Sequence, residues 1–339
     1  MKIAIVGCGV AGTLACLECI YLGMDPTDIV LIDPYFDGGS LGRKWGCIQS
    51  NTTWGQIEES LHKYPSAQSS LEYYKTKYTD DQTCCLTDLS LLLVESLRPF
   101  FPKCEIYCEE CLSLHKTENG WMLKLESKEL SVDIVFLCQG GKQKRMDYGK
   151  PILSLEIAFD KKKLEKYLTS KDEVILFGLA HSGTLILKNL LEIGCRINAV
   201  YKGKEPFLFA RDNQYDGIKQ ESAEIADMLR MTKPQTITYI RSTSIQGLVK
   251  AIQRSNWIFN ATGFEAETIP IYSTDNQLIS AFQYSPESAE ICQNLYGFGL
   301  AYPGVTTVEG VTYKDVSIPS FVQQICRTLP AILSKNSDS

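Results

Sequence analysis

The chain has 339 residues, of which 44% are hydrophobic and 22% charged, a composition typical of a globular protein with room for two domains. Its 34 basic and 40 acidic residues give a net charge of −6 without a concentrated basic run, so we expect neither nucleic acid nor an anionic membrane as a partner. No apolar run reaches the roughly 18 residues of a membrane span, and the first residues already form a predicted strand, so we expect no signal peptide.

The first twelve residues, MKIAIVGCGVAG, predict an apolar strand, a glycine turn and the start of a helix. Gly7 allows the tight turn, Gly9 leaves the backbone open to a pyrophosphate, and Gly12 lets the helix pack closely on the strand. Val10 and Ala11 lie between the last two glycines, where the helix N-terminus presents free N–H groups to phosphates. The spacing therefore predicts a site for the diphosphate of a dinucleotide.

The residues that follow support this interpretation. A helix is predicted over 13–22, and a second apolar strand over 29–32 leads into Asp33. Asp33 comes 21 residues after Gly12, where a carboxylate accepts hydrogen bonds from ribose hydroxyls. The alternative is an ordinary glycine-rich turn between a strand and a helix, with no ligand.

The middle of the first half contains a predicted β-meander. Residues 54–88 are polar and irregular in pattern, and residues 89–100 predict an amphipathic helix. An apolar strand over 132–137 follows the meander and ends in Cys138-Gln139-Gly140-Gly141. The three predicted meander strands are 104–110, 112–115 and 121–126.

The same order of features returns about 170 residues later. A strand over 173–177 enters the turn GLAHSG at 178–183, and a helix over 184–193 leads to a strand over 197–201. A later strand, 257–260, again ends in small residues, Ala261-Thr262-Gly263. This duplication predicts an α/β fold with a Rossmann-like domain that carries a β-meander and an inserted second Rossmann-like domain. We place the first domain at 1–155 and 285–339, and the second at 156–284.

This pattern resembles the two-dinucleotide-binding-domain flavoproteins. That superfamily includes thioredoxin reductase-like enzymes, flavin-containing monooxygenases and N-hydroxylating monooxygenases. The resemblance implies that the first glycine turn binds FAD and the second binds NAD(P)H. It further implies that Gly7, Gly9, Gly12 and Asp33 hold the ADP half of FAD, and that the backbone at Cys111 passes along the adenine.

Further segments are similar to family motifs. Ala261-Thr262-Gly263 is similar to the family's ATG motif, and Gln139-Gly140-Gly141 to a degenerate first copy of it. A glycine-rich strand over 296–301, which contains Gly299, is followed by a helix that begins near Pro319. We expect this last segment to return to the first domain, with the helix N-terminus facing an anionic flavin.

The stretch Gly38-Gly39-Ser-Leu-Gly-Arg-Lys-Trp45, followed by Ser50-Asn51-Thr52, is similar to a region of the flavin-containing monooxygenases. Carried over, Asn51 would lie near the flavin C4a atom and the nicotinamide; alternatively it caps a turn. Trp45 and Trp54 either wall the flavin pocket or belong to the core.

The second turn departs from the family pattern. Gly178, His181, Ser182 and Gly183 match it, but Ala180 replaces the second glycine, and its methyl group would crowd a pyrophosphate. Lys202, with Lys204 and Arg211 nearby, would hold a 2′-phosphate and favour NADPH over NADH, or these are solvated surface residues. His181 either fills a variable position of the motif or acts as a general base. The first domain also departs from the family pattern, because the acidic residue that contacts the flavin ribityl chain in the family has no counterpart near Gly299.

Thirteen cysteines without a disulfide-like pattern indicate a reducing, cytoplasmic compartment, and three scattered histidines give no support for a zinc site. Dithiol chemistry is not favoured. Five residues before Cys47, where the second cysteine of a dithiol pair would stand, the sequence has Gly42. Cys108 and Cys111 lie on a predicted strand, and Cys16 and Cys19 fall on the core side of a helix.

The leading hypothesis is an FAD-dependent oxidoreductase that NADPH reduces, acting as a monooxygenase on a small nucleophilic substrate. A second hypothesis is an FAD oxidoreductase or oxidase that does not use NAD(P)H. A third is a flavin-binding sensor or interaction protein without turnover. Ala180 favours the second and third hypotheses over the first.

Overall fold

The computed structural model describes residues 1–203, 205–207, 210–211, 214–215, 220–280, 283–308 and 311–337. The chain divides into two compact units. Unit 1 comprises Met1–Gly46, Thr53–Lys142 and Glu265–Ser339, and unit 2 comprises Cys47–Thr52 and Gln143–Phe264.

Unit 1 is built on a six-stranded sheet with the strand order β20-β21-β9-β1-β2-β5. All neighbouring strands are parallel except β20 and β21, which pair antiparallel. The strands are β1 (Ile3–Val6), β2 (Ile29–Ile32), β5 (Glu105–Tyr107), β9 (Ile134–Leu137), β20 (Glu290–Cys292) and β21 (Leu295–Gly297). Because β1 lies at the centre, the turn that follows it opens at the carboxyl edge of the sheet.

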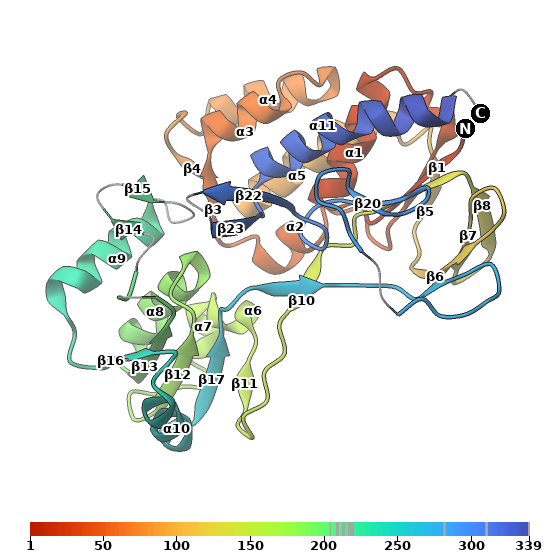
Figure 1. Cartoon of the computed structure of the whole chain (residues 1–339). Helices are drawn as coiled ribbons and strands as arrows, with labels where there is room; N and C mark the ends of the chain where they lie inside the picture. Colours follow the sequence, from red (N-terminus) through yellow and green to blue (C-terminus); the bar gives the residue numbers. More distant parts are fainter. Residues whose placement is uncertain are drawn as a thin grey trace. The chain divides into compact units, whose positions relative to one another are not determined.

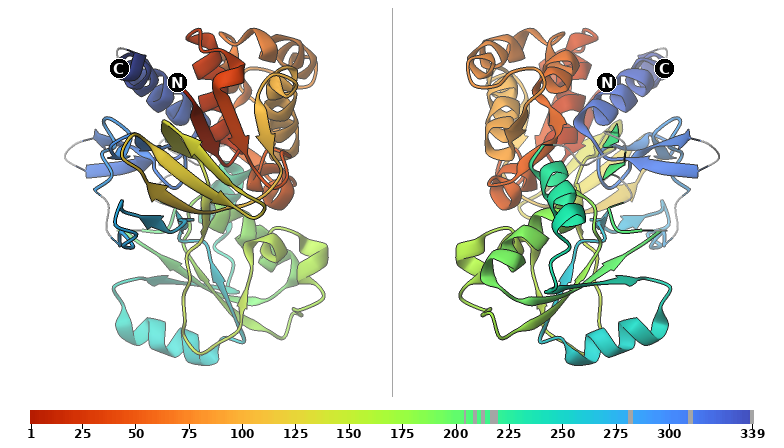
Figure 2. Two further views of the ribbon diagram at one scale, coloured as in Figure 1. Left: turned by 90° about the vertical axis from the view of Figure 1, so that its right-hand side faces the viewer. Right: turned by 90° about the vertical axis from the view of Figure 1, so that its left-hand side faces the viewer.

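Alternate residues of each central strand face opposite sides of this sheet. Ile3 and Ile5 pack on α1 (Val10–Tyr21), α5 (Leu86–Leu97) and α11 (Ile318–Ser337), the helical layer seen in Figure 1. Ala4 and Val6 pack instead on a four-stranded sheet, whose strands between residues 111 and 132 are drawn in yellow in Figure 2. Both faces are therefore buried, which explains why these strands are continuously apolar.

The four-stranded sheet contains the predicted meander, with one correction. Its order is β19 (Ile271–Tyr272), β6 (Cys111–Lys116), β7 (Trp121–Leu125) and β8 (Glu129–Val132). The segment expected as its first strand, 104–110, instead forms β5 and pairs parallel with β2. The pattern was misassigned because a three-residue edge strand carries too few positions to distinguish a meander from a parallel sheet.

Residues 54–88 are also more regular than the sequence suggested. They form α3 (Trp54–Leu61), a 3₁₀ turn η2 (Pro65–Ala67), α4 (Gln68–Lys75) and β4 (Thr83–Cys85). Trp54, Ile57 and Leu61 share one helical face and are buried, while the many polar residues cover the other side. A capping box between Thr53 and Gln56 starts α3.

Unit 2 repeats the central arrangement with five parallel strands in the order β11-β17-β12-β13-β16. The strands are β11 (Ile152–Leu153), β12 (Glu173–Phe177), β13 (Arg196–Tyr201), β16 (Ile237–Arg241) and β17 (Trp257–Asn260), and the helices are α6 (Leu155–Ala158), α7 (Lys161–Leu164), α8 (His181–Ile193), α9 (Glu221–Thr232) and α10 (Ile245–Arg254). The run β17-β12-β13-β16 corresponds to β9-β1-β2-β5 of unit 1, so the duplication is structural as well as sequential.

The chain passes between the units through β10 (Gly141–Gln143) and β18 (Phe264–Ala266), which pair with each other. The unit boundaries after 142 and 264 differ from the predicted domain boundaries at 155 and 284. They differ because β11 is the edge strand of the second sheet and β19 belongs to the meander sheet. Two residues in each strand give no usable sequence signal.

Short elements complete the described part of the chain: η1 (Pro26–Asp28), α2 (Ser40–Trp45), β3 (Gln49–Thr53), η3 (Arg98–Phe100), and the hairpins β14–β15 (Ala210–Arg211 and Gln214–Tyr215) and β22–β23 (Gly304–Val308 and Val311–Asp315). Over the residues the structure describes, no helix combines the length and apolar character needed to cross a bilayer.

Candidate functional site: two glycine turns

The first glycine turn is held by main-chain contacts that require glycine at two of its three positions. Gly7 has φ +91°, and its N–H donates to the carbonyl of Ile32 at 2.8 Å. A Cβ on Gly7 would lie 2.7 Å from the carbonyl oxygen of Cys138, and a Cβ on Gly12 would overlap the carbonyl oxygen of Gly7. A Cβ on Gly9, in contrast, would meet nothing closer than 3.7 Å. The fold therefore requires Gly7 and Gly12 but not Gly9.

The second turn reproduces these contacts. Gly178 has φ +94°, and its N–H donates to the carbonyl of Val200 at 2.9 Å. A Cβ on Gly178 would lie 2.5 Å from the carbonyl oxygen of Ala261, and one on Gly183 would overlap the carbonyl oxygen of Gly178. Ala180 occupies the position of Gly9 and is exposed.

Gly9 and Ala180 also share a backbone conformation. Each is the N-cap of the following helix, with φ −73° at Gly9 and φ −87° at Ala180, values that any residue adopts. Ala180 shows that this turn accepts a methyl group without distortion. The fold would therefore accept a methyl group at position 9, but Gly9 leaves that space empty. The empty space fits the close approach of a pyrophosphate to the backbone.

Asp33 lies at the carboxyl end of β2 with its carboxylate turned toward the first turn. One oxygen accepts from the N–H of Cys8 at 2.8 Å, and the other accepts from Tyr35 and Phe36 at 2.8 and 2.9 Å. The carboxylate thus braces the glycine turn, and the oxygen facing Cys8 keeps a lone pair for a further donor. Strand register places Tyr201 at the matching position of unit 2.

The Gly38-Gly39 turn lies directly against the first glycine turn. A Cβ on Gly39 would be 3.0 Å from the Cα of Gly9, and one on Gly38 would overlap the hydroxyl of Ser90. Trp45 ends α2 and is half-buried, whereas Trp54 is only 1% exposed and packs in the core against Tyr74 at 5.9 Å between ring centroids. Trp54 is therefore part of the hydrophobic core of unit 1.

Several further predicted residues lie around the same sheet edge. Gly140, after β9, has φ +79° and open space around its Cα, and the side-chain oxygen of Gln139 is buried without a hydrogen-bond partner. Gly299 has φ +82° and lies against the helix start, since its Cβ would be 2.5 Å from that of Ala11. Leu300 follows Gly299 and packs against the core cluster of unit 1.

The predicted residues at the first helix start and in the meander differ in exposure. Val10 begins α1 and is half-buried, and Ala11 is buried. Cys111 is buried on β6, and burial raises the pKa of its thiol to about 12. Only its backbone is therefore suited to the role that the resemblance implies.

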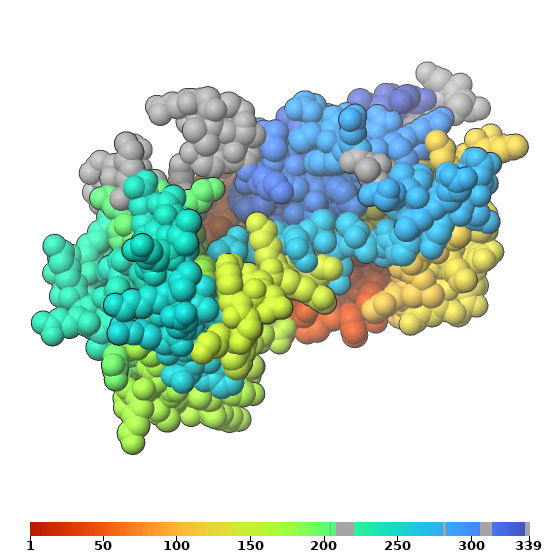
Figure 3. All heavy atoms as spheres, turned by 60° about the horizontal axis from the view of Figure 1, so that its bottom comes forward, coloured from red at the N-terminus to blue at the C-terminus, as the bar shows by residue number. Residues whose placement is uncertain are grey.

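In unit 2, Ser182 and Gly183 begin α8, and Gly263 has φ +102° with no atom within 4 Å of a would-be Cβ. Lys202 follows β13 and is exposed. Lys204 and the side chain of Arg211 lie outside the described residues. The basic segment 142–145, within the yellow-green stretch of Figure 3, lies at the surface apart from the half-buried Gln143.

Asn51 and His181 both belong to unit 2, because residues 47–52 group with it. The side-chain oxygen of Asn51 accepts from the hydroxyl of Thr52 at 3.4 Å. The His181 ring lies 3.0 Å from the Ser222 hydroxyl through Nδ1 and 3.3 Å from the Gln49 carbonyl through Nε2. Burial lowers the pKa of His181. With both ring nitrogens engaged, His181 is not arranged as a general base.

The cysteine contacts do not form a dithiol centre. Cys16 and Cys19 lie on α1, and both side chains are fully buried in the core. Burial raises the pKa of the Cys19 thiol to about 12. Cys108 is exposed and precedes β6, whereas Cys111 is buried on β6, so the two thiols have different surroundings. Among the described residues, no group of three or more His, Cys, Asp or Glu side chains is arranged to hold a metal ion.

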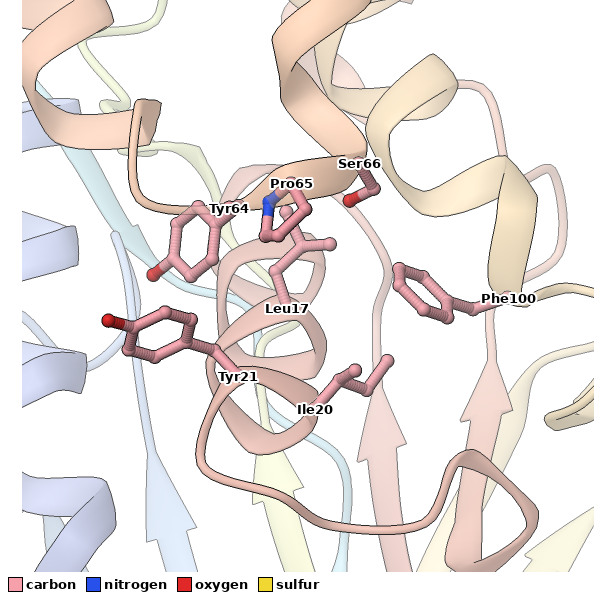
Figure 4. Close-up of a pocket in the computed structure, with 7 residues that line it drawn as sticks. All are labelled: Leu17, Ile20, Tyr21, Tyr64, Pro65, Ser66 and Phe100. Carbon is pink, nitrogen blue, oxygen red and sulfur yellow. The ribbon is translucent and has the colours of Figure 1, made fainter.

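A separate hollow of about 270 Å³ lies on the other end of α1. Tyr21 and Tyr64 form one wall, with ring centroids 6.0 Å apart, and Phe100 lies on the opposite side, as Figure 4 shows. At a rise of about 1.5 Å per residue, Tyr21 is more than about 15 Å along the helix from its N-terminus. The hollow contains none of the predicted site residues and is distinct from the glycine turn.

No protein-family model matches the sequence. A curated relative, the monooxygenase AgnR1 of Paecilomyces divaricatus, is 24% identical, and the match covers 97% of each chain. Among solved structures, the bacillithiol disulfide reductase Bdr (YpdA) of Staphylococcus aureus has a TM-score of 0.68 at 13% identity over 99% of both chains. A flavin monooxygenase from Stenotrophomonas maltophilia has a TM-score of 0.66 at 10% identity over 98% of both.

The chain has the same α/β fold as these solved reductases and monooxygenases. A thioredoxin reductase of T. acidophilum has a TM-score of 0.56 at 14% identity, and the match covers 100% of this chain and 99% of the reductase chain. The fold class predicted from the two glycine turns is therefore confirmed over the whole length. In this fold each glycine turn lies between a central strand and the helix that follows it, β1 and α1 in unit 1 and β12 and α8 in unit 2.

Proposed function

We propose that this protein is an FAD-dependent oxidoreductase that NADPH reduces, with monooxygenase chemistry on a small nucleophilic substrate. The observation that carries the proposal is Gly9, a glycine at a position where the fold tolerates a side chain. Selection of glycine there is explained by a ligand that approaches the backbone closely. The monooxygenase named among the relatives supports the reaction class.

Unit 1 offers groups suited to the ADP half of FAD. The backbone around Gly9 and the N-terminus of α1 would hold the pyrophosphate, and Asp33 would accept a ribose hydroxyl through its remaining lone pair. The unpartnered oxygen of Gln139 would accept one further donor from the cofactor. When bound, FAD supplies the ring that accepts hydride and passes electrons to oxygen.

Unit 2 offers a weaker site for NADPH. The N-terminus of α8 presents the same free N–H groups as α1, but the exposed methyl of Ala180 lies in the position that Gly9 leaves open. Tyr201 replaces the ribose-binding carboxylate, and Lys202 follows it. This exchange favours a cofactor with a 2′-phosphate, because no acidic side chain at this position would repel it.

Asn51 is the residue we propose beside the flavin ring, on the resemblance of residues 38–52 to the flavin-containing monooxygenases. It carries no charge and would orient a bound nicotinamide or substrate through its amide group. Its role is positional, since proton transfer would need a titratable group.

The test is anaerobic titration of the purified, FAD-loaded protein with NADPH and, separately, NADH. Bleaching of the flavin absorbance by NADPH, followed by oxygen uptake with a nucleophilic acceptor such as an amine or sulfide, is the expected result. A protein that takes up no FAD overturns the proposal. FAD that binds but stays oxidised favours the second candidate.

The second candidate, an FAD oxidoreductase or oxidase without NAD(P)H, rests on Ala180. The variant Ala180→Gly separates the two. If Ala180 only weakens NADPH binding, the variant lowers the NADPH concentration for half-reduction by about tenfold, or 1.4 kcal/mol. If NADPH reduces the flavin of neither the wild type nor Ala180→Gly, the result supports the second candidate.

A further inference from the structure

His181 connects three segments of unit 2 that are distant in sequence. It begins α8 at the second glycine turn, its Nδ1 lies 3.0 Å from the hydroxyl of Ser222 on α9, and its Nε2 lies 3.3 Å from the carbonyl of Gln49. Ser222 is fully buried. A second link between the same helices is the ion pair of Lys188 and Glu221 at 2.6 Å.

The hydrogen bonds define the form of the ring. A main-chain carbonyl can only accept, so Nε2 carries the hydrogen that is donated to Gln49. In the neutral ring Nδ1 is then the acceptor, and the Ser222 hydroxyl donates to it. The ring is thus fixed from both sides and acts as a brace between main chain and side chain.

The segment that His181 contacts belongs to a different unit from the residues on both sides of it in sequence. Residues 47–52 group with unit 2, although Gly46 before them and Thr53 after them group with unit 1. Gln49 and Asn51 are two residues apart on β3, so their side chains extend to the same side of the strand. A contact at the carbonyl of Gln49 therefore restrains the backbone one residue away from Asn51.

We propose that His181 is a positioning residue that fixes the Asn51 segment to the second glycine turn, so that the placement of Asn51 depends on a side chain of the nucleotide-binding unit. The functional part of this inference rests on the proposed function, in which Asn51 lies beside the flavin. The structural part, the restraint of residues 47–52 by His181, does not require any cofactor.

The first experiment measures amide hydrogen exchange in the full chain without cofactor. His181→Phe keeps a ring but loses both hydrogen bonds, His181→Gln retains an N–H donor toward Gln49, and His62→Gln is the control at an exposed histidine of unit 1. We expect His181→Phe to speed exchange over residues 47–52 about tenfold or more while β12 stays protected, and His181→Gln to restore most of the protection.

Unchanged exchange over 47–52 in His181→Phe overturns the proposal. So does exchange that rises equally in β12 and is not restored by His181→Gln, because that result makes His181 an ordinary packing residue. Neither outcome depends on whether the protein binds FAD or NADPH, so a failure here is distinct from a failure of the proposed function.

The second experiment uses the FAD-loaded protein and follows flavin reduction at increasing NADPH concentration. We expect His181→Phe to lower the limiting rate about tenfold and to change the half-saturating NADPH concentration much less. In Asn51→Ala the same His181→Phe substitution should have little further effect, because the two residues act on one segment. Additive losses in the double variant, or a loss confined to NADPH affinity, overturn the functional part.

Discussion

Gly9 and Ala180 occupy equivalent positions in two turns with matching backbone contacts, and the difference between them is a single methyl group. Gly7 and Gly12, like Gly178 and Gly183, are demanded by the chain itself, because a Cβ at any of them would meet a carbonyl oxygen. Glycine at these four positions is required for the two turns to form, so it gives no information about a ligand. Only the residue that the fold leaves free to vary carries information about binding.

This difference predicts opposite outcomes for two variants of the first turn. Gly12→Ala places a methyl group on the carbonyl of Gly7 and should lower the free energy of unfolding by about 3 kcal/mol or more. Gly9→Ala should leave the unfolding free energy within about 0.5 kcal/mol of wild type and weaken FAD binding at least about tenfold. Urea unfolding and equilibrium dialysis measure the two quantities. Undiminished FAD affinity in a folded Gly9→Ala variant would contradict the pyrophosphate assignment.

The buried ring of His181 predicts a dependence of stability on pH. Burial lowers its pKa, while the hydrogen bond to the Gln49 carbonyl and the charge of Glu221, which pairs with Lys188, act in the opposite direction. The unfolded chain, with a histidine pKa of about 6.5, therefore binds a proton first as the pH falls. This contribution to the unfolding free energy is complete above about pH 7.5 and is lost as the pH falls from 6.5 to the folded pKa. His181→Gln should show a shallower loss between pH 7.5 and 5; an equal slope in both proteins would refute it.

At the scale of elements, α3 and α4 show how a polar segment becomes part of a core. Trp54 is buried against Tyr74 and Tyr78, with ring centroids 5.9 Å away in each case. Its indole N–H has no hydrogen-bond partner. The aromatic area thus stabilises the α3–α4 pair while the unpaired donor offsets part of that gain.

We therefore expect the two truncations of Trp54 to differ. Trp54→Ala leaves a large cavity and should lower the free energy of unfolding by about 4 kcal/mol. Trp54→Phe keeps most of the apolar contact and removes the unpaired donor, so its cost should stay below about 1.5 kcal/mol. Thermal unfolding of both variants gives the comparison. Equal losses would mean that the indole N–H has a partner in solution.

At the scale of the whole molecule, two sheets that share a run of four parallel strands carry glycine turns that differ at one glycine position, Gly9 in unit 1 and Ala180 in unit 2. Unit 1 combines Gly9, Asp33 and the unpartnered Gln139 at the edge of its sheet, whereas unit 2 has Ala180 and Tyr201 at matching places. On the proposed function, the first unit would therefore hold its dinucleotide more tightly than the second.

This asymmetry predicts unequal stabilisation by the two cofactors. FAD at about 100 times its Kd should add about 2.7 kcal/mol and raise the Tm by roughly 5–10 °C. NADPH at millimolar concentration should raise the Tm by less than about 2 °C, because only the weaker turn binds it. Scanning calorimetry with each cofactor separates the cases, with ADP as a control for the shared half of both molecules. A larger shift with NADPH than with FAD would reverse the assignment of the turns.

The sequence by itself determined both glycine turns, the strand before each, and the duplication, because these features depend on contacts between residues near in sequence and on main-chain geometry that only glycine allows. It also determined that Cys16 and Cys19 lie in the core, since their spacing places both on one helical face.

Only the tertiary structure decided the rest. The edge strands β5, β11 and β19 have two or three residues each, and their partners are set by packing across the chain rather than by periodicity. The burial of Trp54 and the brace from His181 to Gln49 likewise join residues that no local pattern relates, the latter 132 positions apart. Contacts of this range follow from the fold as a whole, so no stretch of sequence contains them.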